Sequence, residues 1–158
     1  MKSDNDRIRV LYEQQARGLA TYACSFLSDF ATAEDVVHQV FQRLLRGDIE
    51  LRDPPVPYLY TAVRNATIDC LRNRPRNVAL DDDWFKNTTV SHEVVVLLQS
   101  ALREIPEEQR EVVVMHVWGQ LTFDEIATTL DISPKTAASR YRYGLAKLRE
   151  QFKPATKG

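Results

Sequence analysis

The residues best suited to chemistry at a charged surface lie in one short segment, SPKTAASRYRY, at positions 133–143. Ser133 is a favoured N-cap residue and Pro134 suits the first helical position, so a helix is predicted to begin here. At 100° per residue, the inner face of this helix carries Ala137, Tyr141, Leu145 and Leu148. The outer face carries Lys135, Ser139, Arg142, Tyr143 and Ala146, flanked by Thr136 and Arg140.

Small residues set between cations and hydroxyl groups suit a helix that lies in the major groove of DNA, where Lys and Arg reach phosphates or guanine edges. Upstream, Thr122 and Glu125 form a capping box for a short helix that ends near Leu130. Two helices separated by three residues have the spacing of a helix-turn-helix motif. The segment therefore predicts a DNA-recognition helix, with an ordinary surface helix of an all-α domain as the alternative.

The charge is segregated along the chain. The whole sequence has 21 basic and 22 acidic residues, a net charge of −1. Residues 135–158 contain seven cations and one acid, whereas residues 93–131 contain two cations and eight acids. A second basic patch includes Arg64, Arg72, Arg74 and Arg76. This segregation predicts separate surfaces for separate partners.

Several classes of protein do not fit the sequence. No apolar run approaches the roughly 20 residues that span a bilayer, and the N-terminus has no apolar signal region, so a cytoplasmic location is expected. Cys24 and Cys70 are expected to be reduced thiols, and the scattered His38, His92 and His116 give no metal site. No phosphate-binding glycine loop or nucleophile motif is present. We therefore expect no catalytic residues, no metal and no cofactor.

The elements that position these residues are predicted to be helices throughout, in an all-α fold of two small helical domains. A helix containing residues 8–27 comes first, Thr32 is predicted to cap a second that ends at Gly47, and a third covers residues 57–73. Four more follow, over about 92–104, from Pro106 to near Gly119, over 122–130 and from residue 134 onward. The expected domains are residues 1–74 and 92–153, joined by a linker at 75–91.

The predicted linker contains an acidic run at 81–83, followed by Trp84 and Phe85. Two adjacent aromatic side chains are unusual in a free tether, so they are expected to dock on a neighbouring domain or to contact a partner.

Three segments together resemble a known family. They are ATAEDVVHQVFQRLLRG (31–47), YLYTAVRNATIDCLRNRPR (58–76) and the stretch from residue 102 to residue 150, which includes LTFDEIA and SPKTAASR. In this order they are similar to the polymerase-binding helix, the −10-binding stretch and the −35-reading domain of bacterial RNA polymerase sigma factors. The resemblance is to the extracytoplasmic-function (ECF) type, group 4 of the sigma-70 family, and covers nearly the whole chain.

A few positions depart from the family pattern. His38 and Gln39 stand where Gln-Glu is usual, which removes one acidic polymerase contact. Tyr58 replaces a frequent Trp and Thr61 a frequent Arg. Ala138 stands where many relatives carry Arg or Lys, which puts one −35 contact in doubt.

The resemblance implies a specificity subunit that binds core RNA polymerase, at the clamp helices and the flap of its large subunits, and promoter DNA. It implies that the residues contacting polymerase are Asp35, Gln39, Phe41 and Arg43. The residues that it implies for contact with the displaced −10 strand are Tyr58, Tyr60, Arg64, Asn65, Asp69 and Arg72. Core packing is the alternative for the two tyrosines. The residues that it implies for contact with the −35 duplex are Lys135, Thr136, Ser139, Arg140, Arg142 and Tyr143. An anti-sigma factor is an expected further partner.

Three other functions remain as alternatives. A stand-alone helix-turn-helix regulator would use the C-terminal half but leave residues 31–76 without a role. A sigma-like adaptor without promoter function would account for the departures at 38–39 and at Ala138. A hydrolase is the third, although no motif supports it.

Overall fold

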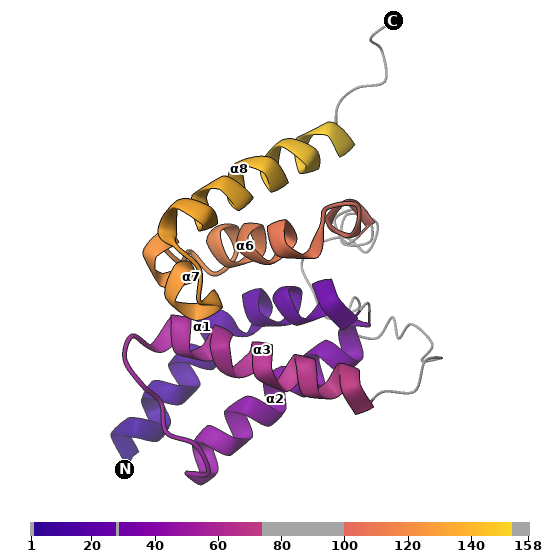
Figure 1. Ribbon diagram of the computed structural model, residues 1–158. Coiled ribbons are helices and arrows are strands. Elements are labelled where there is room, and N and C mark those ends of the chain that lie inside the picture. Colours follow the sequence, from indigo (N-terminus) through magenta and orange to yellow (C-terminus); the bar gives the residue numbers. More distant parts are fainter. Residues whose placement is uncertain (1, 28, 74–99, 153–158) are drawn as a thin grey trace, which may run out of the picture.

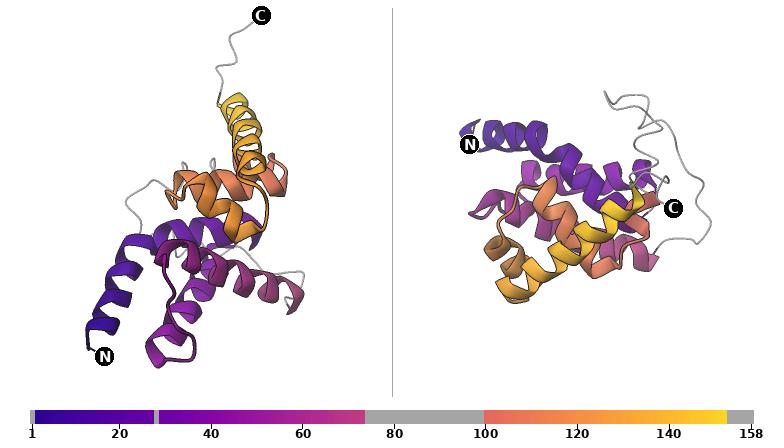
Figure 2. Two further views of the ribbon diagram at one scale, coloured as in Figure 1. Left: turned by 60° about the vertical axis from the view of Figure 1, so that its left-hand side comes forward. Right: turned by 90° about the horizontal axis from the view of Figure 1, so that it is seen from above.

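The computed structural model describes residues 2–27, 29–73 and 100–152, and all the regular elements in these ranges are α-helices (Figures 1 and 2). The all-α prediction is confirmed. The predicted linker at 75–91, with the 81–83 acidic run, Trp84 and Phe85, lies outside the described residues. So does most of the helix predicted over 92–104, of which residues 100–103 are helical. None of the described helices has the length and apolar character needed to cross a membrane.

Three helices form the N-terminal half: α1 (Lys2–Leu27), α2 (Phe30–Arg46) and α3 (Pro55–Asn73). Helix α3 begins two residues earlier than predicted, because proline is tolerated in the first turn of a helix. Their apolar faces meet in a core whose largest fully buried side chains include Tyr22, Tyr60, Leu19 and Leu59. Figure 2 shows the long helix α1 lying across α2 and α3, and α1 packs against both of them.

The start of α2 differs from the prediction that Thr32 caps it. Asp29 is the N-cap: its backbone is extended and its carboxylate accepts a hydrogen bond from the Ala31 N–H at 3.1 Å. The Thr32 hydroxyl donates to the other carboxylate oxygen of Asp29 at 2.5 Å. Helix α2 is therefore capped three residues earlier than predicted. The predicted end at Gly47 is confirmed, with φ at 81° in the left-handed region.

The C-terminal half contains α6 (Glu107–Val117), α7 (Phe123–Leu130) and α8 (Pro134–Gln151). The predicted capping box is present, with Glu125 and Thr122 bonded reciprocally at 2.9 and 3.1 Å. Ser133 caps α8 by accepting from the Thr136 N–H at 3.0 Å. Three residues separate α7 from α8, so the predicted helix-turn-helix is confirmed.

Helix α6 lies between α8 and the N-terminal half, against α1, while α7 packs against α3 (Figure 1). Buried residues of both halves belong to one continuous hydrophobic cluster. The two halves approach each other closely at two glycines. A Cβ on Gly119 would lie 2.8 Å from Tyr60 Cζ, and one on Gly18 would lie 2.8 Å from the Tyr60 hydroxyl and 3.2 Å from the Trp118 carbonyl oxygen. Residues without side chains therefore let the two halves fit together.

Candidate nucleic-acid interface

Helix α8 presents the predicted basic face to solvent. Lys135, Arg142 and Tyr143 are exposed, Tyr143 by 60%. Ser139 is half-buried, and Ala137 on the opposite face is completely buried. The helical-wheel assignment of the two faces is therefore confirmed. Cations and a phenol hydroxyl on one exposed face can donate hydrogen bonds to phosphates and base edges.

An aromatic cluster under α8 fixes its orientation. The His116 ring stacks on Phe123 with the ring centroids 4.6 Å apart and meets the Tyr141 ring edge-on at the same distance. His116 Nδ1 lies 2.9 Å from the Leu121 carbonyl oxygen. These three rings come from α6, α7 and α8, so they hold the helix-turn-helix as a rigid unit beneath its outer face.

Two predicted −35 residues have partners within their own half. The Arg140 guanidinium lies 3.7 Å from the Glu108 carboxylate and its side chain is 28% exposed. The Thr136 hydroxyl accepts from the Ser133 hydroxyl at 2.9 Å. Because an exposed ion pair of this length is weak, Arg140 can exchange Glu108 for a phosphate at little cost.

Several of the predicted polymerase-binding and −10-binding residues line one groove of about 800 Å³ between α2 and α3. Asp35, Gln39 and Arg43 line the α2 wall, and all three are exposed. The α3 wall holds Asn65 and Asp69, which are also exposed, and the half-buried Tyr58. The residues predicted to bind polymerase and those predicted to bind the −10 strand therefore lie on facing walls of the same groove.

Phe41 and Arg72 lie outside this groove. Phe41 is 3% exposed and packs edge-on against Tyr12 with the ring centroids 5.1 Å apart, so its ring belongs to the core. It also lines an apolar hollow of about 270 Å³ between α1 and α2. Arg72 is exposed in the last turn of α3, where a cation also interacts favourably with the helix dipole.

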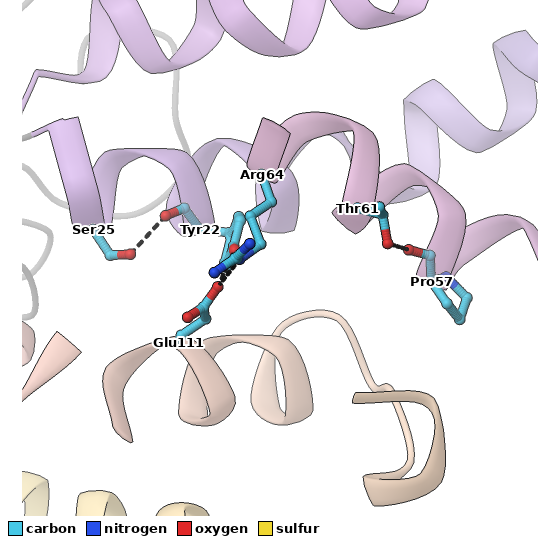
Figure 3. A network of polar contacts seen from close by, with 6 residues as sticks. All are labelled: Tyr22, Ser25, Pro57, Thr61, Arg64 and Glu111. Carbon is cyan, nitrogen blue, oxygen red and sulfur yellow. Dashed lines mark hydrogen bonds and ion pairs between the residues drawn. The ribbon is translucent and has the colours of Figure 1, made fainter. Parts of the chain in front are cut away.

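Arg64 has a partner that the sequence analysis did not anticipate. Its Nε donates to the Glu111 carboxylate of α6 at 2.5 Å, and the Tyr22 hydroxyl of α1 donates to the same oxygen at 2.6 Å (Figure 3). The Glu111 side chain is 8% exposed, against 36% for Arg64. One buried carboxylate of the C-terminal half thus joins two residues of the N-terminal half.

The electrostatics of this network follow from its burial. Burial raises the pKa of Tyr22 well above its usual value, and the charge of Glu111 adds to this effect. For Arg64, burial lowers the pKa, but the hydrogen bond and charge of Glu111 oppose burial, and the pKa is raised overall. Tyr22 therefore stays protonated and Arg64 stays charged. Both remain hydrogen-bond donors to Glu111.

Tyr60, a predicted stacking residue for the −10 strand, is completely buried beside this network. Its ring meets that of Tyr22 edge-on at 5.4 Å and faces Gly119 on the other side. Its hydroxyl has no hydrogen-bond partner among the described residues. In this arrangement the ring belongs to the core, which was the alternative left open by the sequence.

The sequence analysis missed the residues that join the two halves. The Arg110 guanidinium donates to the Ser25 carbonyl oxygen across the interface, and also to the Ile105 carbonyl oxygen at 3.2 Å. From the sequence, Glu111 is only one of the eight acids in residues 93–131. A helical wheel of α6 would have placed it beside Val112 and Met115, which are fully buried. A lone carboxylate next to such residues indicates a partner.

The described residues contain no group of three or more His, Cys, Asp or Glu side chains that could hold a metal ion. Cys24 is buried and Cys70 half-buried at the edge of the α2–α3 groove.

Comparisons with known proteins agree with this arrangement. Residues 11–77 match the family described as Sigma-70 region 2, and residues 96–148 match Sigma-70, region 4. The chain is 31% identical over 153 residues to the ECF RNA polymerase sigma factor SigL of Mycobacterium tuberculosis, covering 90% of this chain and 86% of SigL. It is 26% identical to the RNA polymerase sigma factor SigZ of Bacillus subtilis, with 90% of this chain and 85% of SigZ covered.

A solved structure has the same fold. It is the sigma factor RpoE in complex with the anti-sigma factor NepR from Bartonella quintana, with a TM-score of 0.72, 19% identity, and coverage of 95% of this chain and 98% of that one. An all-α chain with a region 2 half and a region 4 half is a sigma factor of the sigma-70 type. The chain belongs to the ECF RNA polymerase sigma factors, which direct transcription initiation at particular promoters.

Proposed function

We propose that α8 reads the −35 duplex through Lys135, Thr136, Ser139, Arg140, Arg142 and Tyr143. The observation that carries this proposal is the exposed basic face of α8 within a helix-turn-helix. The half-buried aromatic cluster holds that face toward solvent, and the small Ala138 and Ser139 let it approach the groove floor. Phosphate contacts would position the helix, while Arg142 and Tyr143 would contact base edges.

The −10 strand is bound by α3, through Tyr58, Arg64, Asn65, Asp69 and Arg72, while Tyr60 packs in the core. Asn65 and Asp69 lie one helical turn apart on the exposed side of α3 and can bond to the edges of unstacked bases. The α2–α3 groove is hollow enough to receive a base, with Tyr58 as a stacking surface. Unstacking a base costs a few kcal/mol, which binding of the single strand offsets.

Core RNA polymerase is bound by α2, through Asp35, Gln39 and Arg43, while the Phe41 ring packs beneath this helix in the core. The clamp helices of the polymerase would contact this helix, and the flap would contact the C-terminal half. Because Asp35, Gln39 and Arg43 face the same groove as Asn65 and Asp69, polymerase and the −10 strand would meet at adjacent surfaces.

The domains proposed from the sequence are residues 1–74 for polymerase and −10 binding, and 92–153 for −35 binding, with the linker at 75–91 between them. The chain acts in the cytoplasm as a specificity subunit, without an active site, metal or cofactor of its own. An anti-sigma factor is its proposed regulator, as the related Bartonella protein is solved with one.

Run-off transcription with purified core RNA polymerase on a genomic promoter library tests this function. The chain is expected to bind core enzyme and to direct initiation at a limited set of promoters, whereas core enzyme alone serves as the control. Failure to bind core enzyme, or binding without a defined start site, would contradict the proposal.

A stand-alone helix-turn-helix regulator is not favoured, because the region 2 match gives residues 11–77 a role that such a regulator lacks. A gel-shift assay distinguishes a stand-alone regulator from a sigma factor. We expect the free chain to bind promoter duplex weakly and without sequence preference until core polymerase is added.

A further inference from the structure

The cations on the outer side of α8 are not equally free to reach the bases of a −35 duplex. The Arg140 guanidinium lies 3.7 Å from the Glu108 carboxylate of α6, so it is held at the edge of α8 that packs on α6. Lys135 and Arg142 are exposed, and neither pairs with another of the described residues. These two side chains are therefore the cations best placed to reach base edges in the groove.

Ala138 lies between these two cations on the surface of α8. Positions 135, 138, 139 and 142 follow the i, i+3, i+4, i+7 spacing, so they form one continuous stripe along the helix. The long side chains of Lys135 and Arg142 stand at its ends, and Ala138 lies beside Ser139 at its centre, where both are half-buried. Because the N-terminal residues of a recognition helix contact base edges, this centre is expected to face a base pair.

A base that faces Ala138 meets a methyl group and no hydrogen-bonding side-chain atom. In the major groove, each base presents polar atoms, but thymine also presents its C5-methyl group. A polar base edge held against Ala138 would lose water without gaining a partner, which is unfavourable. Contact between the alanine and thymine methyl groups removes apolar surface from water instead.

The neighbours of Ala138 determine where this contact forms. Lys135 and Arg142 lie about one turn to either side, and both side-chain types prefer the O6 and N7 atoms of guanine. The base pair facing Ala138 therefore lies between those that the cations reach. The Ser139 hydroxyl can donate or accept, so it tolerates several bases beside that position. Ala138 is thus left to discriminate at the centre of the stripe.

We propose that Ala138 is a specificity-determining residue, which selects a thymine in the −35 element by contact with its C5-methyl group. This inference rests on the proposed function in one respect, the docking of α8 in the major groove of the −35 duplex. It concerns the identity of one base, whereas the affinity for any duplex depends on the surrounding cations.

The test uses holoenzyme, assembled from the full chain and core polymerase, and chemically altered promoters. Each −35 thymine of a promoter selected in the run-off assay, on either strand, is replaced in turn by deoxyuridine, which lacks only the methyl group. Competition binding is expected to weaken about threefold to fivefold at one thymine, as for the loss of one buried methyl group. In Ala138→Gly holoenzyme, the replacement of that thymine is expected to have no effect.

Ala146→Gly is the matched control for Ala138→Gly. Ala146 is exposed about two turns further along α8, and its replacement removes the same methyl group with the same loss of helix propensity. The deoxyuridine effect is expected to persist in Ala146→Gly holoenzyme. Circular dichroism checks that both variants fold.

A second measurement uses Ala138→Arg and a promoter library with a randomised −35 element. Unaltered holoenzyme is expected to select thymine at the position where deoxyuridine weakens binding, and Ala138→Arg holoenzyme to select guanine there, because a guanidinium bonds to guanine O6 and N7. If Ala138→Gly fails to fold or to bind the promoter, this change of base preference carries the test.

The outcomes separate this inference from the proposed function. A deoxyuridine effect at no −35 thymine, or one that persists in Ala138→Gly, overturns the inference even when holoenzyme initiates at defined promoters. An unchanged base preference in Ala138→Arg overturns it as well. Holoenzyme without any −35 preference overturns both the inference and the role of α8, which the run-off assay records separately. A methyl effect that Ala138→Gly abolishes and Ala146→Gly retains supports the inference.

Discussion

At the residue scale, a few buried polar side chains contribute to the free energy of unfolding of this protein. Tyr22 and Tyr60 are both fully buried and their rings meet edge-on. Among the described residues, the Tyr22 hydroxyl has a hydrogen-bond partner, the Glu111 carboxylate at 2.6 Å, and the Tyr60 hydroxyl has none. A buried hydroxyl stabilises the fold when it is hydrogen-bonded and destabilises it when it is not. The two tyrosines can therefore be compared directly, because each has one buried hydroxyl and they differ in whether it is hydrogen-bonded.

Removing each hydroxyl is expected to change stability in opposite directions. Tyr22→Phe takes a donor from a buried carboxylate and should lower the free energy of unfolding by about 1–2 kcal/mol. Tyr60→Phe removes a hydroxyl without a partner and should leave stability unchanged or raise it by up to about 1 kcal/mol. Urea denaturation followed by circular dichroism measures both. Equal losses in the two variants would show that the Tyr60 hydroxyl is satisfied after all.

A second prediction concerns Arg142, the exposed cation in the middle of the α8 outer face. Arg142→Ala is expected to weaken −35 recognition by roughly 1–3 kcal/mol and to relax the preference at one base pair, because a guanidinium that contacts a base edge carries sequence information. The measurement is run-off transcription by the holoenzyme on promoters with single −35 substitutions.

Lys147→Ala is the control for Arg142, since Lys147 is an exposed cation of the same helix on a different face. Its loss should affect all promoters equally or not at all. If Arg142→Ala leaves the promoter preference intact, Arg142 contacts a phosphate or makes no contact.

At the level of helices, the packing of α8 on α6 depends on one residue. Gly144 is buried, and a Cβ there would lie 2.8 Å from Val113 Cγ2 and 3.1 Å from Gln109 Cβ. Val113 is itself fully buried and has little freedom to move. Close packing is the reason that a glycine occurs in the middle of the recognition helix.

Gly144→Ala is therefore expected to destabilise the protein, although alanine has the higher helix propensity. The propensity gain of about 1 kcal/mol is outweighed by overpacking, which costs about 1–3 kcal/mol. Ala146→Gly, at an exposed position of α8, is the companion variant and should cost about 1 kcal/mol through propensity alone. Chemical denaturation compares the two, and a more stable Gly144→Ala would mean that α8 can move away from α6.

At the scale of the whole molecule, the two halves are not independent modules in this arrangement. Their buried residues form one cluster, and α6 lies between α8 and α1 (Figure 1). Substitutions at the contacts between the halves should therefore affect the stability of both halves.

Thermal unfolding of the free chain should report this coupling. Because the halves share one hydrophobic cluster, differential scanning calorimetry is expected to record a single cooperative transition, with equal calorimetric and van't Hoff enthalpies. Glu111→Arg should broaden the transition or divide it in two, whereas Glu107→Arg should not. Two separate transitions in the unaltered chain would show that the halves unfold independently.

The sequence by itself determined the helices, most of their ends and the family. Ser133, the Thr122–Glu125 pair and Gly47 act within one turn of the chain, so their roles can be read from local spacing. The outer face of α8 followed from helical periodicity for the same reason. The cap of α2 was predicted wrongly because Asp29 and Thr32 are both good caps, and only the actual path of the backbone decides between them.

Only the tertiary structure decided which residues meet between the halves. Arg64 and Glu111 are 47 residues apart, and Tyr22 and Glu111 are 89 apart, so no local pattern connects them. The burial of Tyr60 and the close approach at Gly119 likewise depend on how two amphipathic surfaces fit. Contacts of this kind arise from the shape and charge of faces that the chain brings together only after each helix has formed.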